Sequence, residues 1–201
     1  MAERKKKMDK PVNIAIFASG AGSNAAKLIE YFHNYPQINI SMVVCNVPQA
    51  GVLSIANQHQ IDSLVIQKEQ FFRGDAYLPV FENYAIDWIV LAGFLWKVPP
   101  AIIKAFPGHI VNIHPALLPR YGGKGMYGHF VHEAVIENKE KQSGISIHYV
   151  DEIYDHGKII FQATCEVETT DTAITLAKKI QQLEHRFFAP EIHKLIMSNC
   201  S

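Results

Sequence analysis

Short apolar segments alternate with helical patterns over the first half of the chain, and this alternation restricts the fold more than any other feature. Each segment is nearly continuous in hydrophobic residues, as strands buried on both faces of a sheet are. Strands that alternate with helices predict an α/β fold with a doubly wound, mainly parallel sheet. The expected strands are 12–18, 38–45, 63–66, 87–93 and 110–113, with helices at 51–58, 75–83 and 99–106, a helical pattern through Leu28, Ile29 and Phe32, and a loop at 67–74.

The second half of the chain follows a different pattern. A glycine-rich segment, 120–128, reads as a mobile loop and precedes a helix expected at 130–138. Residues 144–150 alternate apolar and polar side chains, as antiparallel strands do, and 158–167 fits a hairpin partner. A long amphipathic helix is expected to follow, from Thr172 to about Leu195. Its expected inward positions are Ile174, Ala177, Ile180, Leu183 and Phe187, and its outward ones are Lys178, Lys179 and Gln182.

Composition narrows the class of protein. The 201 residues, 48% of them hydrophobic, suffice for a single domain, expected at 12–201 after a flexible basic leader at 1–11. Lysine plus arginine number 19, as do aspartate plus glutamate, so the zero net charge argues against a nucleic-acid-binding role. No uninterrupted apolar run reaches membrane-spanning length, and the leader lacks the apolar core of a secretory signal. The scattered cysteines Cys45, Cys165 and Cys200 favour a reducing, cytoplasmic setting.

A glycine-rich turn, Ser19–Asn24, follows the first strand and opens the first helix. This layout presents backbone N–H groups and a helix N-terminus to an anion, and Ser23 and Asn24 add side-chain donors. The turn formally fits the dinucleotide fingerprint, but the second strand runs into Asn46–Gln49 without the acidic residue that would hold a ribose, so NAD is disfavoured. A triphosphate P-loop is excluded because no Gly-Lys-Ser/Thr follows. A monophosphate site is favoured over a tight turn without a ligand.

Asn112 and His114 lie where the fifth expected strand runs into a loop opened by Pro115. Alternate residues of a strand point to one face, so the amide and the imidazole are expected side by side. An amide that holds a developing oxyanion and an imidazole that moves a proton would suit an acyl-transfer site. The alternative is a strand-end asparagine and histidine that are satisfied by backbone groups.

Several polar or glycine-rich features are expected at one edge of the sheet. Open α/β sheets bind ligands at the carboxyl ends of their strands. The turn Ser19–Asn24, the segment Gly93–Val98 and the pair Asn112 and His114 all follow such ends. Asp155 lies in the hairpin turn, and if the hairpin folds back, its carboxylate reaches His114 and favours the charged imidazole. One shared site is therefore expected.

His129 and His132 are compatible with a metal site, because their spacing can place them on one face of a helix. No third ligand stands at a suitable spacing in the sequence. No metal is therefore expected.

Four motifs together resemble the folate-dependent phosphoribosylglycinamide (GAR) formyltransferases. They are Ser19–Asn24 (SGAGSN), Leu91–Phe94 (LAGF), Asn112–Pro119 (NIHPALLP) and the turn Asp151–Gly157. The resemblance covers about residues 12–196. The third motif with a distant aspartate is shared among folate-dependent formyltransferases, and the first points to the GAR branch. The implied fold is Rossmann-like, with an antiparallel C-terminal hairpin and a long C-terminal helix.

The resemblance also implies roles for individual residues. Asn112, His114 and Asp155 would be the catalytic trio. The GAR phosphate would be held by Gly22, Ser23 and Asn24, and the sugar or glycinamide would contact Glu184. Folate contacts would come from Arg73, Phe94, Leu95, Trp96, Lys97, Val98, Asp151 and Glu152. Two features of this chain depart from the family pattern: Trp96 stands where family members carry an arginine, and the loop at 122–132 is longer than theirs.

The implied activity is transfer of the formyl group of 10-formyltetrahydrofolate, a co-substrate, to the amine of GAR in de novo purine biosynthesis. Asn112 and His114 would stabilise the tetrahedral oxyanion, while Asp155 would raise the pKa of His114 and relay a proton. The partners would be small molecules, without nucleic acid or membrane, and the enzyme would be a cytoplasmic monomer or homodimer. Alternatives are another folate-dependent formyltransferase, a formyltetrahydrofolate hydrolase and a non-catalytic nucleotide-binding module.

Overall fold

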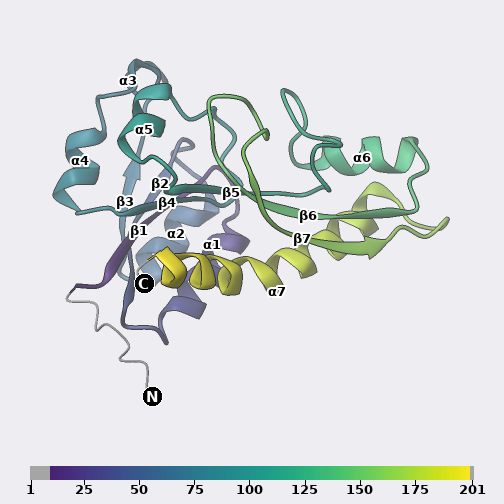
Figure 1. Ribbon diagram of the computed structural model, residues 1–201, viewed down its shortest axis with the longest axis horizontal. Coiled ribbons are helices and arrows are strands. Elements are labelled where there is room, and N and C mark those ends of the chain that lie inside the picture. The colour runs from purple at the N-terminus through teal and green to yellow at the C-terminus, as the bar shows by residue number, and fades with distance from the viewer. Residues whose placement is uncertain (1–9, 200–201) are drawn as a thin grey trace.

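A seven-stranded sheet organises the computed structural model, which describes residues 10–199 (Figure 1). The strands lie in the order β3-β2-β1-β4-β5-β6-β7 across the sheet. Apart from Lys10 and Pro11, the expected basic leader at 1–11 lies outside the described residues. The strands are β1 (Val12–Ala18), β2 (Ile38–Cys45), β3 (Asp62–Val65), β4 (Trp88–Leu91), β5 (Ile110–His114), β6 (Gln142–Tyr149) and β7 (Ile159–Glu166).

Strands β1 to β5 are parallel, and the sheet changes direction after them. β1 lies between β2 and β4, and β2–β3 and β4–β5 complete the parallel part. β6 is antiparallel to both β5 and β7. The predicted doubly wound, mainly parallel sheet with an antiparallel C-terminal hairpin is therefore confirmed.

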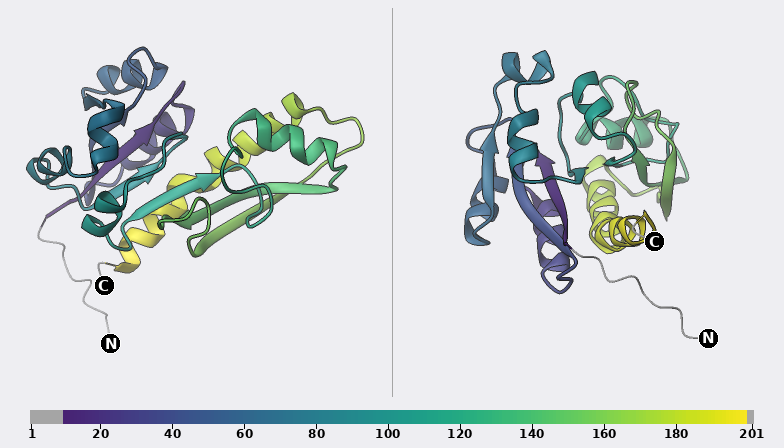
Figure 2. Two further views of the ribbon diagram at one scale, coloured as in Figure 1. Left: turned by 90° about the horizontal axis from the view of Figure 1, so that it is seen from above. Right: turned by 60° about the vertical axis from the view of Figure 1, so that its left-hand side comes forward.

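Helices cover both faces of the sheet (Figures 1 and 2). Helices α3, α4 and α5 bury Phe71, Phe81 and Ile102 against one face. Helices α1 and α7 bury Leu28 and Ile180 against the other face, which α2 also covers. None of the described helices is both long and apolar enough to cross a membrane. The helices are α1 (Ser23–Phe32), α2 (Gly51–Gln58), α3 (Lys68–Arg73), α4 (Leu78–Asn83), α5 (Pro100–Ala105), α6 (His129–Glu137) and α7 (Ala173–Asn199).

Two local predictions are wrong. The segment expected to be a loop at 67–74 contains helix α3, because fully buried Phe71 anchors this short stretch in the core. Ile174 was expected to face inward, but it is 72% exposed. The buried stripe of α7 instead runs through Leu176 and Ile180, and Ile174 lies about 200° around the helix from Leu176.

Strand β6 is buried on both faces, although its alternating pattern suggested a strand with one face in water. Its polar residues Ser146 and His148 are almost inaccessible. The hydroxyl of Ser146 donates to the carbonyl of Ala116 at 2.7 Å and accepts from the N–H of Leu118 at 2.9 Å. The loop after β5 therefore covers this face, and the alternation marks polar side chains that point into the protein.

Gly157 offers a test of how tightly the β6–β7 connection is packed. A Cβ at this position would overlap the carbonyl oxygen of Tyr149. We expect Gly157→Ala to lower the unfolding free energy by roughly 1–3 kcal/mol, because the backbone of the turn has to shift. Thermal or urea unfolding measures the change. Gly20→Ala is the matched control, since a Cβ there meets nothing within 4 Å; equal losses in both variants would contradict this account.

Candidate functional site

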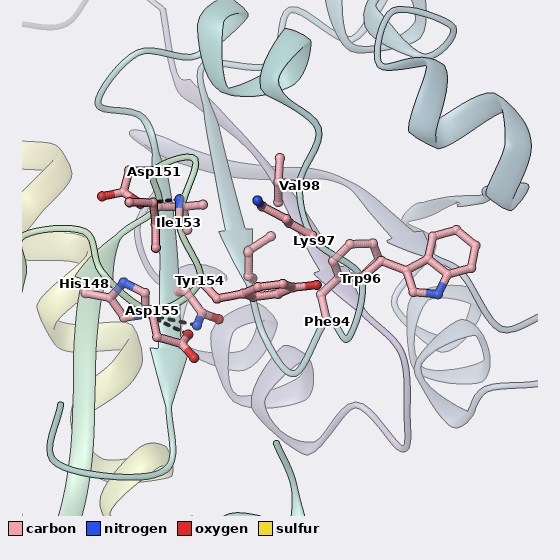
Figure 3. Close-up of a pocket in the computed structure, with 12 residues that line it drawn as sticks. Phe94, Trp96, Lys97, Val98, His148, Asp151, Ile153, Tyr154 and Asp155 are labelled. Atoms are coloured by element: carbon pink, nitrogen blue, oxygen red, sulfur yellow. Dashed lines mark hydrogen bonds and ion pairs between the residues drawn. The ribbon is translucent and has the colours of Figure 1, made fainter. Parts of the chain in front are cut away.

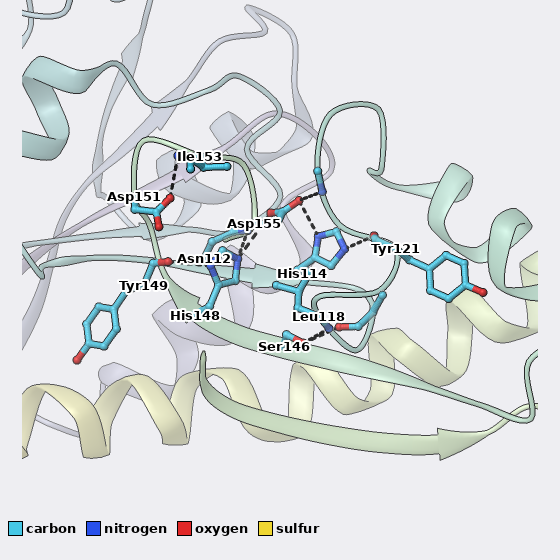
Figure 4. Close-up of polar contacts among 12 residues, drawn as sticks. Asn112, His114, Leu118, Tyr121, Ser146, His148, Tyr149, Asp151, Ile153 and Asp155 are labelled. Atoms are coloured by element: carbon cyan, nitrogen blue, oxygen red, sulfur yellow. Dashed lines mark hydrogen bonds and ion pairs between the residues drawn. The ribbon is translucent and has the colours of Figure 1, made fainter. Parts of the chain in front are cut away.

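Strand β5 presents Asn112 and His114 on one face of the sheet (Figure 4). The pairing with β6 sets Asn112 opposite His148 and His114 opposite Ser146. After β6 the turn at 151–157 folds back, and it brings Asp155 within 3.7 Å of both His114 and His148. The three residues expected to be catalytic thus lie together, with a fourth polar side chain among them.

His148 orients the amide of Asn112. Nδ1 of His148 lies 2.8 Å from the carbonyl oxygen of Tyr149, which can only accept, so Nδ1 carries the proton. In the neutral ring Nε2 is then an acceptor, and it receives the Nδ2–H of Asn112 at 3.1 Å. This arrangement directs the donor end of the amide and leaves its second N–H for a ligand.

His114 is oriented by a different carbonyl. Its Nε2 donates to the carbonyl oxygen of Tyr121 at 2.7 Å, so Nδ1 is unprotonated in the neutral ring. Nδ1 lies 3.7 Å from Oδ2 of Asp155. Proton uptake and release by this imidazole therefore occur at Nδ1, beside a carboxylate.

Asp155 is held between two segments of the chain. Its Oδ2 accepts from the backbone N–H of Gly123 at 2.8 Å, so the glycine-rich segment contacts the carboxylate directly. Its backbone φ of +52° lies in the left-handed region, which residues other than glycine seldom adopt. Such strain persists where surrounding contacts over-determine the backbone, as they commonly do at functional sites.

Burial has the largest effect on the pKa values of His114 and His148. Desolvation lowers the pKa of His114 below its ordinary value, and Asp155 and the Tyr121 carbonyl only partly offset this effect. Desolvation lowers the pKa of His148 in the same way. Burial thus opposes the charged form of His114 and Asp155 favours it, so the expected imidazolium stays a prediction for the state in which a ligand adds negative charge beside the ring.

Two cavities meet at this cluster. The larger, about 800 Å³, lies between the turn after β1, the glycine-rich segment and α7. The smaller, about 70 Å³, lies between the segment after β4 and the turn at 151–157 (Figure 3). Asn112 and Asp155 line both cavities. The polar cluster can therefore act on a group that passes from a molecule in one cavity to a molecule in the other.

Glu184 places a carboxylate deep in the larger cavity. Its Oε2 accepts from Nδ2 of Asn24 at 2.9 Å. Burial raises the pKa of Glu184, and the Asn24 hydrogen bond only partly counteracts it. The Oδ1 of Asn24 is buried too, and it has no hydrogen-bond partner within the described chain. The pair can therefore accept hydrogen bonds from hydroxyl or amino groups of a ligand.

The first helix begins beside the same cavity. Gly22 precedes it with a φ of +83°, and within residues 10–199 no side chain caps the helix. Its first backbone N–H groups are therefore available to an anion. Gln181 on α7 donates to the hydroxyl of Ser23 at 3.3 Å. Of the three residues expected at a phosphate, Asn24 lines the larger cavity, whereas Gly22 and Ser23 adjoin it in the chain.

Ser19 connects the surroundings of the two cavities. Its hydroxyl donates to Oδ1 of Asn46 at 2.5 Å and accepts from the backbone N–H of Leu95 at 2.9 Å. The turn after β1 and the segment after β4 are therefore fixed to each other by one side chain.

The residues expected at folate divide between the cavities. Phe94, Trp96, Lys97, Val98 and Asp151 line the smaller cavity, and the ammonium of Lys97 lies 5.5 Å from the centre of the Tyr154 ring. Phe94 and Leu95 line the larger cavity. Arg73 and Glu152 line neither of these two cavities, as far as the described residues show.

Sequence reasoning missed two residues of the site. His148 orients Asn112, and Gln181 contacts Ser23. Signals for both were present: His148 interrupts an apolar strand, and Gln181 precedes Glu184 by about one helical turn. Only the β5–β6 register, which the sequence does not reveal, identifies the partner of His148.

The possible metal ligands lie beside the same cavity. His129 and His132 line the larger cavity, and Nδ1 of buried His132 has no hydrogen-bond partner in the described residues. Over residues 10–199 no three histidine, cysteine, aspartate or glutamate side chains form a group that could hold a metal ion.

Comparison with known proteins places these motifs in context. Residues 12–192 match the family model described as formyl transferase. A phosphoribosylglycinamide formyltransferase from Bacillus subtilis is 31% identical, over 92% of this chain and 95% of that protein. A chloroplastic phosphoribosylglycinamide formyltransferase from Arabidopsis thaliana is 38% identical over 87% of this chain. The chain spans about three-fifths of the length of the Arabidopsis and Vigna unguiculata relatives.

Solved structures agree in fold. The crystal structure of phosphoribosylglycinamide formyltransferase from Bacillus halodurans superimposes with a TM-score of 0.82 at 35% identity, over 92% of this chain and 95% of that one. The corresponding protein from Anaplasma phagocytophilum gives a TM-score of 0.85 at 30% identity, over 94% of this chain and 89% of that one.

The buried histidines predict how stability depends on pH. Burial lowers the pKa of His114, His132 and His148, so the unfolded chain takes up protons at a higher pH than the folded one. The neutral histidines therefore cost the folded state nothing above the ordinary histidine pKa, about 6.5, and the free energy of unfolding decreases as the pH falls below that value. We expect the thermal unfolding midpoint to drop from about pH 7 to about pH 5.

Calorimetry at several pH values measures this dependence. His148→Gln is expected to weaken it, and His59→Gln, at an exposed histidine on the surface, is expected to leave it unchanged. A midpoint that stays constant over this range, or that responds equally to both substitutions, would contradict the prediction.

Proposed function

The chain belongs to the formyl transferase family, and on that premise we propose that it transfers the formyl group of 10-formyltetrahydrofolate to the amine of GAR, in de novo purine biosynthesis. The names of the relatives from Bacillus subtilis and Arabidopsis support GAR as the acceptor. The observation that carries the proposal is that Asn112 and Asp155 line two adjoining cavities. A donor and an acceptor each need a space, and the formyl carbon has to lie where the spaces meet.

The larger cavity suits the acceptor. The phosphate of GAR would bind at the start of α1, to the backbone N–H groups of Gly22, Ser23 and Asn24. Glu184 and the unpaired Oδ1 of Asn24 would accept hydrogen bonds from the ribose hydroxyls or the glycinamide. Ligand groups would then satisfy the buried polar atoms that the protein leaves without partners.

The smaller cavity suits the pterin of the donor. Its wall consists of the segment Phe94–Val98 on one side and the turn that carries Asp151 and Tyr154 on the other. Rings of this kind bind between apolar and aromatic side chains, with a few polar groups to fix their orientation. Leu95 would contact the donor from the larger cavity, and Arg73 and Glu152 would contact it outside the smaller cavity, which neither of them lines.

The chemistry follows from the hydrogen bonds of the trio. The glycinamide nitrogen attacks the formyl carbon, and the C=O electron pair moves to the oxygen. The free N–H of Asn112 and a proton at Nδ1 of His114 stabilise this oxyanion, since negative charge beside the imidazole raises its pKa. Asp155 passes the proton of the attacking amine towards N10 of the folate, directly or through water. The C–N10 bond then breaks and the formyl group remains on GAR.

The setting of the reaction is part of the proposal. Cys45 and Cys165 are both free, which supports a reducing compartment such as the cytoplasm. The reactants are small molecules, and the enzyme would work as a monomer or a homodimer without nucleic acid, membrane or metal.

Formyl transfer tests the proposal directly. The reaction of 10-formyl-5,8-dideazafolate is followed by absorbance with GAR and without it. We expect turnover only with GAR. We expect Asn112→Ala, His114→Ala and Asp155→Asn each to lower kcat on the order of 100- to 1000-fold, because each removes a group that stabilises or relays charge in the transition state. Turnover without GAR would indicate a hydrolase and contradict the proposal.

Glu184→Gln separates binding from stability. Loss of a charged acceptor is expected to raise the KM for GAR roughly 10- to 100-fold, with little change in the KM for the donor. The same substitution is expected to raise the thermal unfolding midpoint, since it removes a buried carboxylate whose pKa burial raises. Glu82→Gln, on the exposed surface of α4, is the matched control. A lower midpoint with unchanged KM would refute the assignment of Glu184.

A further inference from the structure

A continuous series of aromatic rings runs from the core to the surface beside the smaller cavity. Phe17 contacts Phe94, and Phe94 contacts Phe71, with ring centres 5.3 and 5.7 Å apart. Trp96 lies 5.8 Å from Phe71 and 5.7 Å from Phe72. Phe17 and Phe71 are fully buried, Phe94 and Trp96 are partly buried, and Phe72 at the outer end is exposed; Trp96 and Phe72 are the outer two rings. We call this outer pair the aromatic shelf.

Helix α3 does not need Phe72 of the aromatic shelf to hold it against the core. Phe71 is fully buried and already anchors this six-residue helix. The neighbouring Phe72 is 48% exposed. Phe72 lies beside the partly buried Trp96, so the two form contiguous apolar surface, and such surface next to a cavity marks a contact site.

The aromatic shelf is continuous with the smaller cavity. Trp96 lines that cavity, and in Figure 3 its ring lies on the far side of Tyr154 from Asp155 and His148. A ligand that starts beside the polar cluster and leaves through this cleft therefore passes over Trp96 and then Phe72. The planes of the two rings are inclined by 38° to each other, so a flat ligand ring can contact both in tilted geometry.

We propose that the aromatic shelf binds the p-aminobenzoyl ring of the folate donor by stacking. The inference rests on the proposed function and adds to it a contact for the part of the donor outside the pterin. A flat aromatic amide is the portion of a reduced folate that adjoins N10, and aromatic rings attract one another in offset or tilted contact. Both shelf residues are uncharged, so this contact recognises the ring rather than the carboxylates of the glutamate.

Tryptophan fluorescence tests binding without the need for turnover. The chain has two tryptophans, and Trp88→Phe leaves Trp96 as the sole reporter. Three probes are compared: 10-formyl-5,8-dideazafolate, p-aminobenzoylglutamate and 6-hydroxymethylpterin. We expect all three to change the Trp96 emission, because Trp96 also lines the cavity assigned to the pterin. We expect Phe72→Leu, in the same background, to raise the Kd of the first two probes roughly three- to tenfold and to leave the Kd of the pterin, which lacks the benzoyl ring, unchanged. An equal change in the Kd of the pterin, or no response to p-aminobenzoylglutamate at saturation, would overturn the proposal.

Steady-state kinetics provide the second test. We expect Phe72→Leu and Trp96→Leu each to raise the KM for the donor roughly three- to tenfold, the effect of one lost aromatic contact, with kcat and the KM for GAR unchanged. Phe130→Leu, at an exposed aromatic of α6, is the matched control. Because Phe72 is exposed, its variant tests the shelf even if Trp96→Leu folds poorly.

The outcomes separate this inference from the function on which it rests. GAR-dependent turnover with an unchanged donor KM in both shelf variants would refute the shelf and leave the proposed function standing. Absence of GAR-dependent turnover in the unaltered protein would refute the proposed function, and the fluorescence titration would still decide whether the shelf binds the benzoyl ring.

Discussion

The antiparallel pairing of β6 with β5 is the constraint on which the site depends. It sets His148 opposite Asn112, so that a neutral imidazole fixes which end of the amide faces a ligand. Side chains alternate between faces along a strand, so a register slip of one residue would turn His148 away from the site. The same pairing decides where the chain leaves β6, and hence the point from which the turn returns Asp155 over β5. One ladder of backbone hydrogen bonds thereby positions side chains from three separate segments.

Burial gives the site its chemical character. The same exclusion of water lowers the pKa of His114 and His148 and raises the pKa of Glu184. Buried polar groups such as these lower the stability of the protein without a ligand. A ligand that supplies the missing charge or hydrogen bond makes their burial favourable. The polar atoms that weaken the fold are thus the ones that a substrate can stabilise, and orientation is established before the substrate arrives.

Much of the fold could be predicted because it depends on local pattern. Strand–helix alternation gave the parallel sheet, and the motif around Asn112 and His114 located its polar edge. The failures had tertiary causes. Helix α3 exists because the sheet buries Phe71, and the inward face of α7 is set by its contacts rather than by the first apolar residue, Ile174. His148 was overlooked because a histidine within a strand acquires a role only through the residue opposite it.

The hydroxyl of Ser19 adds to the backbone hydrogen bond from Ser19 to Gly93 in joining the turn after β1 to the segment after β4. It needs to donate to Asn46 and accept from the backbone of Leu95 at the same time. Among small side chains only a hydroxyl both donates and accepts a strong hydrogen bond, so threonine is the one replacement that can keep both contacts. A substitution that moves one of these two segments to fit a new ligand therefore disturbs the hydrogen bonds of Ser19, even if Ser19 does not contact that ligand. The shape of one cavity thereby limits how far the other can change in evolution.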